Sequence, residues 1–275
     1  MIEIIRNMEH LLGISHIKDF CAFRGQSDAR WHLTTTFERA AFNLESADRG
    51  DLEQKIILEF KRRAHHYLSK VPEKTSHLEW LSLLQHFGGP TRLLDFTRSF
   101  YIALYFAIEG AQSDSAVWVV DISFLSEEKP TLGVKSTYSE KAEVTVNEIL
   151  KTPGRRDDKP GIVAVEPFTL NERMSIQQGL HLFPKNLYKT FEQNLFEPLG
   201  VNEDKAVRKY IIPKKLHLLI TDWLAQMNIT AATLFPGLDG FARSQITHVK
   251  LAQHSREIIE RAIREAMESF AKQPK

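Results

Sequence analysis

The chain has 275 residues, of which 43% are hydrophobic and 26% are charged. These proportions are ordinary for a globular protein with a sizeable core, and the length suits one large domain or two small ones. The formal net charge of +1 excludes a chain-wide electrostatic attraction for nucleic acid or for an acidic membrane, so any anion site must be a local cluster.

Cys21 is the one cysteine of the chain. A single cysteine excludes an intramolecular disulfide framework and a multi-cysteine zinc site, and it fits a reducing compartment. The first 20 residues mix acids and histidines without a continuous apolar run, so we expect no signal peptide. The most apolar stretch, 100–108, is about half as long as a membrane span. We therefore expect a cytoplasmic protein.

The first half of the chain predicts mainly helices. A short strand is expected over 17–25 (IKDFCAFRG), and apolar residues at helical spacing predict an amphipathic helix over 51–68. Ser76 and Glu79 have the spacing of a capping box, which would begin a helix that ends at Gly88. A polar loop, GPTRLLDFT, is expected next. The helix over 99–110 that follows is apolar on nearly all sides and should be buried.

The second half is expected to begin with a core strand over 115–122, which is rich in β-branched residues. A helix is predicted over 137–150, and the sequence TPGRRDDKPG after it is the most loop-like segment. Two more strands are expected over 162–167 and 209–213, with a turn-rich segment over 174–184 between them. Helices are predicted over 216–227 and 247–270, and a short element from Thr230 to the sequence PGLDG separates them.

Together these elements predict a single α+β domain. It should have a small mixed or antiparallel sheet, many helices, and a C-terminal helical portion packed against it. We expect residues 1–245 to form the α+β part and residues 246–275 to form a C-terminal helix of the same domain.

The segment FRGQ at 23–26 is the first candidate for a site. Arg24 at the end of a strand could direct its guanidinium at a phosphate or carboxylate, and Gly25 beside it could let a ligand approach the backbone. The alternative is a surface arginine in a turn.

The densest polar segment is 85–97, QHFGGPTRLLDFT, at a junction between two predicted helices. Such junctions expose backbone N–H groups and gather side chains that can bind anions. Arg92 and Asp95 are expected to pair, with at least one of them largely buried, and the pair could pin the loop, shape a pocket, or do both. His86 could act as an acid or base, although a histidine at a helix end is more often a cap.

Two later segments are typical of polar turns when each is taken alone. They become candidates for the site only because they occur together with the two motifs above. The sequence RMSIQQG at 173–179 brings Gln177 and Gln178 in front of a glycine, and FPGLDG at 235–240 contains Asp239 in a turn pattern. Phosphate-loop, dinucleotide-binding, nucleophile-elbow and zinc-protease motifs are absent from the sequence. Polar segments between apolar elements commonly assemble ligand sites, so we expect Arg24, His86, Arg92, Asp95 and Gln178 to converge on one pocket.

Taken together, FRGQ, QHFGGPTRLLDFTRSFYIALYFA, RMSIQQG and FPGLDG make the chain resemble the FRG-domain family, over roughly residues 19–243. The long middle motif is the specific part. The resemblance implies a bacterial or phage-borne protein, of a kind often encoded near mobile elements or defence genes. It implies no particular reaction.

The order of the motifs is also similar to that of mono-ADP-ribosyltransferases. In those enzymes an early arginine or histidine holds NAD, a polar motif precedes a central helix, and a late Glu or Gln meets the nicotinamide ribose. Here the late motif offers glutamines, and Glu166 lies on the preceding strand. By this resemblance NAD would be a substrate, with no other cofactor implied, and a site without its glutamate could bind a nucleotide without consuming it.

Two functional classes therefore remain open. One is an NAD-consuming effector in phage defence or toxicity, and the other is a non-catalytic module that binds nucleotide, nucleic acid or protein. The motif order implies catalytic roles for Gln177 and Gln178, and His86 is a catalytic candidate through its acid–base chemistry. No metal ligand is expected. The residues expected to contact the ligand are Arg24, Gly25, Gln26, Gln85, Thr91, Arg92, Asp95, Thr97 and Arg173.

Overall fold

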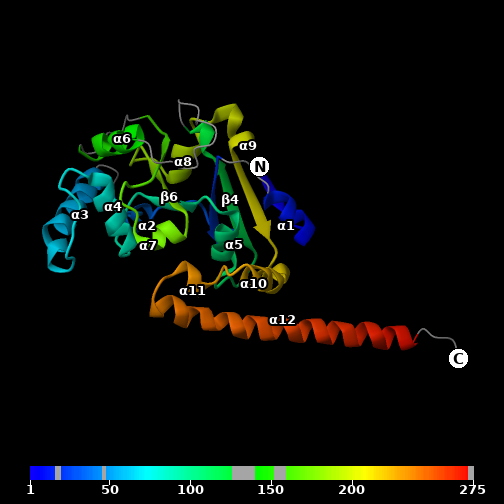
Figure 1. Ribbon diagram of the computed structural model, residues 1–275. Helices are drawn as coiled ribbons and strands as arrows, with labels where there is room; N and C mark the ends of the chain where they lie inside the picture. Colours follow the sequence, from blue (N-terminus) through cyan, green and yellow to red (C-terminus); the bar gives the residue numbers. More distant parts are fainter. Residues whose placement is uncertain (16–19, 45–47, 126–139, 152–158, 272–275) are drawn as a thin grey trace.

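A computed structural model of the chain describes residues 1–15, 20–44, 48–125, 140–151 and 159–271. In this part of the chain, one mixed sheet has the strand order β1-β7-β4-β2-β3-β6-β5, and helices cover both of its faces (Figure 1). The α+β prediction is confirmed. Most of the predicted loop over 152–161 lies outside the described residues.

The sheet is antiparallel except for the pairing of β1 with β7, which is parallel. Its strands are β1 (Ile2–Ile4), β2 (Cys21–Gln26), β3 (Leu94–Thr97), β4 (Ser115–Asp121), β5 (Ile162–Val165), β6 (Gly179–Pro184) and β7 (Val207–Ile212).

The described α-helices are α1 (Met8–Ser15), α2 (Thr36–Ala40), α3 (Arg49–Arg63), α4 (His77–His86), α5 (Phe100–Ile108), α6 (Glu140–Lys151), α7 (Glu172–Ile176), α8 (Phe191–Phe196), α9 (Glu203–Ala206), α10 (His217–Gln226), α11 (Ala231–Leu234) and α12 (Leu238–Ala271). Single 3₁₀ turns at Ala64–His66, Ile122–Phe124, Gly200–Asn202 and Lys214–Leu216 connect some of them.

Two segments that were predicted as loop or turn are strands. The end of GPTRLLDFT forms β3, and the end of the turn-rich 174–184 segment forms β6. The two strands pair with each other from Leu94↔Leu182 to Thr97↔Gly179. Each is short, so the pairing with a distant partner, and not the local pattern, decides its conformation.

Helix α4 begins after Ser76 as predicted, but without a capping box. Ser76 makes no side-chain cap, and Glu79 instead accepts a hydrogen bond from the backbone N–H of Thr169 at 3.2 Å. The predicted end of the helix is right: Gly88 follows the cap with a φ of +81°, which glycine adopts without steric cost.

Two hydrophobic clusters sandwich the middle of the sheet. On one face α1, α5 and α10 pack on alternate residues of β2 and β4, including Phe23 and Val119. On the other face Ala22 and Val120 join Leu94, Leu182 and residues of α8. Helix α5 has buried residues on nearly all sides, as predicted, because it lies between the sheet and the C-terminal helices.

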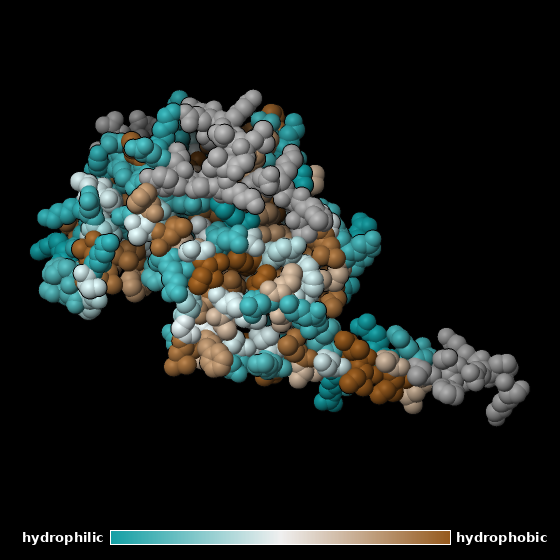
Figure 2. Space-filling view, viewed as in Figure 1, coloured by the Kyte–Doolittle hydropathy of each residue, from teal (hydrophilic) through white to brown (hydrophobic). Residues whose placement is uncertain are grey.

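Helix α12 is longer than predicted and begins within the PGLDG turn. Its first part packs against α10 and α11, and its second part extends away from the rest of the molecule (Figure 1). Apolar side chains on this extension are more than half exposed, at Ile258, Ile259, Ile263 and Met267, and Figure 2 shows them as an apolar patch.

Gly25 of the FRG segment is a packing residue. A Cβ atom there would lie 2.0 Å from the carbonyl oxygen of Ala103 and 2.4 Å from the backbone nitrogen of Ala107, both in α5. The backbone of α5 therefore fills the space that the sequence interpretation assigned to an approaching ligand. Only glycine lets β2 and α5 come this close.

We expect Gly25→Ala to lower the free energy of unfolding by at least about 1–3 kcal/mol, the usual cost of overpacking. Chemical denaturation measures this. Gly13→Ala in α1 is the control, because a Cβ there meets nothing within 4 Å and alanine favours a helix. Equal stabilities for the two variants would show that the contact between β2 and α5 gives way easily.

Candidate functional site

The site lies where β2 and β3 separate. β2 pairs with β4 along its whole length, and β3 pairs with β6 along its whole length, but β2 and β3 share the single pair Phe23↔Thr97. Beyond that pair the guanidinium of Arg24 bridges the gap, and its Nη1 donates to the carbonyl oxygen of Asp95 at 2.6 Å. A split in a sheet leaves an opening for a ligand at the middle of the fold.

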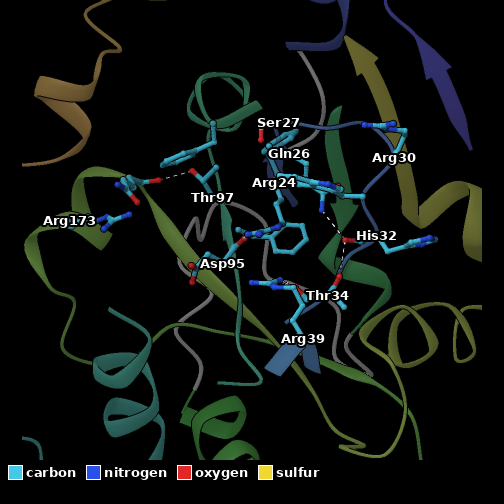
Figure 3. Close-up of a pocket in the computed structure, with 16 residues that line it drawn as sticks. Arg24, Gln26, Ser27, Arg30, His32, Thr34, Arg39, Asp95, Thr97 and Arg173 are labelled. Atoms are coloured by element: carbon cyan, nitrogen blue, oxygen red, sulfur yellow. Dashed lines mark hydrogen bonds between the residues drawn. The ribbon is translucent and has the colours of Figure 1, made fainter. Parts of the chain in front are cut away.

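A cavity of about 680 Å³ occupies this opening. We call it the arginine pocket, because Arg24 from β2, Arg30 from the following loop, Arg39 from α2 and Arg173 from α7 all line it (Figure 3). Asp95 is the one carboxylate among the lining residues. The pocket is therefore strongly basic although the whole chain is almost neutral, as a local anion site requires.

Arg24 is the residue most specifically placed for a ligand. Its Nη1 is bonded to Asp95, while its Nε is buried without a hydrogen-bond partner among the described residues. Burial lowers the pKa of Arg24, the charge of Asp95 raises it in part, and the charge of Arg39 lowers it further. An arginine nevertheless remains charged near pH 7. A buried N–H donor without a partner is costly, and an anion in the pocket would supply one.

The other arginines differ in how far their charge is already compensated. Arg30 is bound to Asp28 at 2.6 Å and is exposed at the rim. Arg39 donates to the carbonyl oxygen of Thr34 at 2.6 Å. The guanidinium of Arg173 stacks over the ring of Phe235 at 4.5 Å, and no carboxylate lies within ion-pair distance of it in the described residues. Arg24, Arg39 and Arg173 thus have no carboxylate partner among the described residues, whereas Arg30 has one.

Gln26 shapes the pocket and has no free polar group. Its Nε2 donates to the carbonyl oxygen of His32 at 3.0 Å (Figure 3), and its Oε1 accepts a hydrogen bond from Trp118 Nε1 at 2.7 Å. Lys209 adds a bond to the carbonyl oxygen of Trp31 at 3.3 Å. These bonds hold the loop after β2 as a wall of the pocket, so Gln26 supports the site where the sequence predicted a ligand contact.

A smaller recess of about 100 Å³ adjoins the arginine pocket and shares Asp95, Phe96, Arg173 and Gln177 with it. We call it the Asp95 recess. Gln85 Nε2 donates to Asp95 Oδ1 at 3.1 Å, and His181 Nδ1 lies 3.0 Å from the same oxygen. The surrounding protein displaces water from Asp95, which would raise the pKa of this partly exposed carboxylate, but the contact with His181 and the charge of Arg24 outweigh this effect and lower the pKa to about 2.

Asp95 should therefore add stability that disappears in acid. Its folded pKa of about 2 lies below the ordinary value of 3.8, so its contribution is complete above that value and is lost as the pH falls toward 2. We expect the stability difference between the parent and Asp95→Asn to shrink as the pH is lowered from about 4 to 2. Urea denaturation over that range measures it, and a difference independent of pH would contradict the lowered pKa.

The predicted pairing of Arg92 with Asp95 is wrong. Arg92 is buried, as expected, but its Nε donates to Glu53 of α3 at 2.6 Å and its Nη2 contacts the other oxygen of the same carboxylate. Its guanidinium also lies 5.0 Å from the ring of Phe183. This bidentate pair pins α3 to the sheet away from the pocket.

Of the five residues that were expected to converge on one pocket, only some lie together. Arg24 and Asp95 line the arginine pocket, and His86 lines the adjoining Asp95 recess. Arg92 lines neither of the two. Gln178 is exposed, has a φ of +47°, and also lines neither. Burial lowers the pKa of His86, and the charge of Arg173 lowers it further.

The remaining predicted contacts are mostly structural. Thr91 is fully buried and donates to Gln85 Oε1, and Thr97 Oγ1 donates to the carbonyl oxygen of Gln177 at 2.7 Å. Gln177 lines both cavities, but its Nε2 already donates to the carbonyl oxygen of Leu234 at 2.9 Å. These bonds join the motifs to one another around the pocket.

The FPGLDG segment closes the outer side of the site. Arg173 and Arg243 both stack on Phe235, at 4.5 and 4.0 Å from the ring centre. Gly240 is needed because a Cβ there would lie 1.7 Å from the carbonyl oxygen of Phe235. Asp239 lines an outer hollow together with His86 and Arg243. Glu166 pairs with Arg98 at 3.0 Å and lines none of these cavities.

Several residues that line the site lie outside the motifs recognised in the sequence. Arg39, Trp31 and His32 line the arginine pocket, and His181 and Ser82 lie behind Asp95. Arg39 and His32 stand in segments without a recognisable pattern, so the sequence alone could not select them. His181 faces Asp95 because β3 and β6 pair with Asp95↔His181 in register. A sequence-based prediction of the pairing of β3 with β6 would have identified His181.

Among the described residues, no group of three or more His, Cys, Asp or Glu side chains is placed to hold a metal ion. Within the same residues, no helix combines the length and the apolar character that a membrane span requires.

Comparison with known proteins identifies one region. Residues 19–116 match the model of the FRG domain, whereas neither the curated proteins nor the solved structures contain a match. The matched region includes Arg24, Gly25, Arg39, Gln85 and Asp95, but ends before Arg173 and Gln177. The chain therefore carries an FRG domain over residues 19–116.

Proposed function

We propose that the arginine pocket binds a nucleotide-like anionic ligand and that Arg24 holds its phosphate. The observation that carries this proposal is the position of Arg24, which has a buried Nε without a partner and lies in a cavity of about 680 Å³. The planar guanidinium matches the oxygens of a phosphate and keeps its charge near pH 7.

The charge of the pocket supports a phosphate in preference to a neutral ligand. Four arginines and one carboxylate line the cavity, and Arg24, Arg39 and Arg173 are not paired with a carboxylate side chain among the described residues. Burial lowers the pKa of Arg24 and also that of Arg173. Arg173 remains exposed, whereas the Nε of Arg24 is shielded from water without a hydrogen-bond partner. An anion would relieve that cost.

The size and the walls of the cavity support a nucleotide in preference to a free phosphate. Small-molecule sites commonly measure about 300–1,000 Å³, and the pocket lies within that range. Phe23, Phe96, Phe106 and Trp31 supply aromatic surface beside the arginines, and Trp31 is 54% exposed. An aromatic ring of this kind can stack on a base while the arginines hold the phosphate.

Calorimetric titration of the protein with NAD, ADP-ribose, ADP and a short oligonucleotide tests the proposal. We expect at least one of the mononucleotide or dinucleotide ligands to bind, with an affinity that falls as salt is added. If none of the four ligands binds, the pocket is not a nucleotide site. The FRG segment would then serve the packing of β2, and the domain would be better regarded as a protein-interaction module.

Consumption of NAD is a second candidate function, and the carboxylate of Asp95 favours it. Asp95 lies in the same cavity as the phosphate-binding candidates, and its low pKa keeps it ionised at neutral pH. An anion there could stabilise positive charge that develops on a ribose. Release of nicotinamide from NAD, measured by mass spectrometry, would support an effector that consumes NAD in toxicity or phage defence. Binding without release would support the non-catalytic module.

Host growth separates these two classes further. If the protein consumes NAD, growth inhibition on expression should depend on Arg24. Inhibition by Arg24→Ala equal to that by the parent would contradict an NAD-consuming pocket.

A further inference from the structure

Behind the arginine pocket, three side chains form a chain of contacts that ends at Asp95. His181 Nδ1 lies 3.0 Å from Asp95 Oδ1, and Ser82 Oγ lies 3.1 Å from His181 Nε2. His181 and Ser82 are 5% and 6% exposed, whereas the side chain of Asp95 is 60% exposed. The buried end of the chain thus supports an exposed carboxylate.

These contacts fix the orientation of the carboxylate. Gln85 Nε2 donates to Oδ1 of Asp95. His181 Nδ1 lies 3.0 Å from the same oxygen, at ion-pair distance but outside hydrogen-bond geometry, and Oδ2 has no hydrogen-bond partner among the described residues. A hydroxyl of Ser82 that donates to Nε2 leaves the imidazole proton on Nδ1, where it faces Asp95. One oxygen is therefore held by the protein, and the other is available to a ligand.

A nucleophilic role for Ser82 does not fit its surroundings. Ser82 lies in the middle of α4 and is buried, and the recess that it lines measures about 100 Å³. A substrate carbonyl that reached its Oγ would have to displace the imidazole or enter the helix. Ser82 and His181 are positioning residues for Asp95.

A carboxylate in a pocket of arginines must face a part of the ligand that donates hydrogen bonds. It accepts hydrogen bonds and repels phosphate. Asp95 is adjacent to Arg24, which bonds to the Asp95 carbonyl oxygen at 2.6 Å. A phosphate on Arg24 therefore places the next group of the ligand, the sugar, beside Asp95.

We propose that Asp95 binds the vicinal hydroxyls of a ribose, and that His181 and Ser82 hold it in place for this contact. The ligand is then a ribonucleotide with free 2′- and 3′-hydroxyls, and deoxyribonucleotides bind poorly. This inference rests on the proposed function, because it assigns the sugar contact of the same pocket. A site built to hydrogen-bond a hydroxyl discriminates strongly against an analogue that lacks it.

Calorimetric titration with ADP and 2′,3′-dideoxy-ADP tests this directly. We expect the parent to bind ADP at least about tenfold more tightly, because the dideoxy analogue loses hydrogen bonds to a charged group. Asp95→Asn should lose most of this discrimination while it still binds inorganic pyrophosphate. ADP that binds the parent no more tightly than the dideoxy analogue, or does not bind it at all, overturns the inference.

The positioning residues have their own test. His181→Leu should lower the ratio of the two affinities, whereas His181→Asn, which keeps an N–H donor near the position of Nδ1, should retain more of it. Ser82→Ala is the milder variant and keeps the test usable if His181→Leu does not fold. An unchanged ratio in His181→Leu and Ser82→Ala would refute their positioning role.

Failure of the ribose contact can be distinguished from failure of the nucleotide pocket. A parent protein that binds ADP and dideoxy-ADP equally well retains the nucleotide pocket and loses only the ribose contact. A parent that binds neither nucleotides nor pyrophosphate loses both proposals.

Discussion

We expect Glu53→Ala to lower the free energy of unfolding by about 3–5 kcal/mol, the usual cost of removing one partner from a buried ion pair. Glu53 holds Arg92 through both carboxylate oxygens, and their side chains are 6% and 2% exposed. Without Glu53 the guanidinium of Arg92 keeps two long contacts of 3.4 Å, to the carbonyl oxygens of Pro184 and Lys185. These are too weak to replace a carboxylate.

Glu59→Ala is the matched control for this experiment. Glu59 lies on the same helix and pairs with Arg62 and Arg63 at 3.0 and 2.8 Å, but its side chain is 35% exposed and its partners are mostly exposed. Surface pairs contribute roughly 0–1 kcal/mol. Chemical denaturation of both variants should therefore show a large difference between them. Equal losses of stability would mean that water reaches the Glu53–Arg92 pair.

Arg24→Ala should have the opposite effect to Glu53→Ala: it should weaken ligand binding and leave stability nearly unchanged. We expect a loss of ligand affinity of at least tenfold, because a charge-assisted hydrogen bond contributes about 1.5–3 kcal/mol, and a melting temperature close to that of the parent. The side chain has one hydrogen bond in the free protein, to the carbonyl oxygen of Asp95, and its unpartnered Nε carries a cost that the variant removes.

Arg62→Ala provides the control for charge. It removes one positive charge from the exposed surface of α3, so it should change neither the affinity nor the melting temperature appreciably. A large drop in the melting temperature of Arg24→Ala with unchanged binding per folded molecule would show that Arg24 supports the fold and not the ligand.

The elements that could be predicted from the sequence are those with a strong local pattern. Helix α5 is apolar on nearly all sides and begins at the N-cap Ser99, whose Oγ accepts from the backbone N–H of Ile102. Strand β4 is a run of β-branched and aromatic residues. Strands β3 and β6 could not be predicted, because both are short and their pairing joins segments more than 80 residues apart.

The site could be predicted in part for a related reason. Arg24 and Asp95 stand in recognisable motifs, and both line the pocket. The partner of Arg92 could not be identified, because Glu53 is 39 residues away in a helix with other acids, and local spacing favoured Asp95. Arg39 and His181 reach the site through tertiary structure alone.

Titration of Arg24→Lys beside the parent with ADP-ribose decides whether Arg24 binds phosphate. Lysine keeps the charge but lacks the planar fork that matches two phosphate oxygens. We predict that the parent binds and that Arg24→Lys binds at least tenfold more weakly at an unchanged melting temperature. Equal affinity of the two proteins would contradict the assignment of Arg24 to the phosphate.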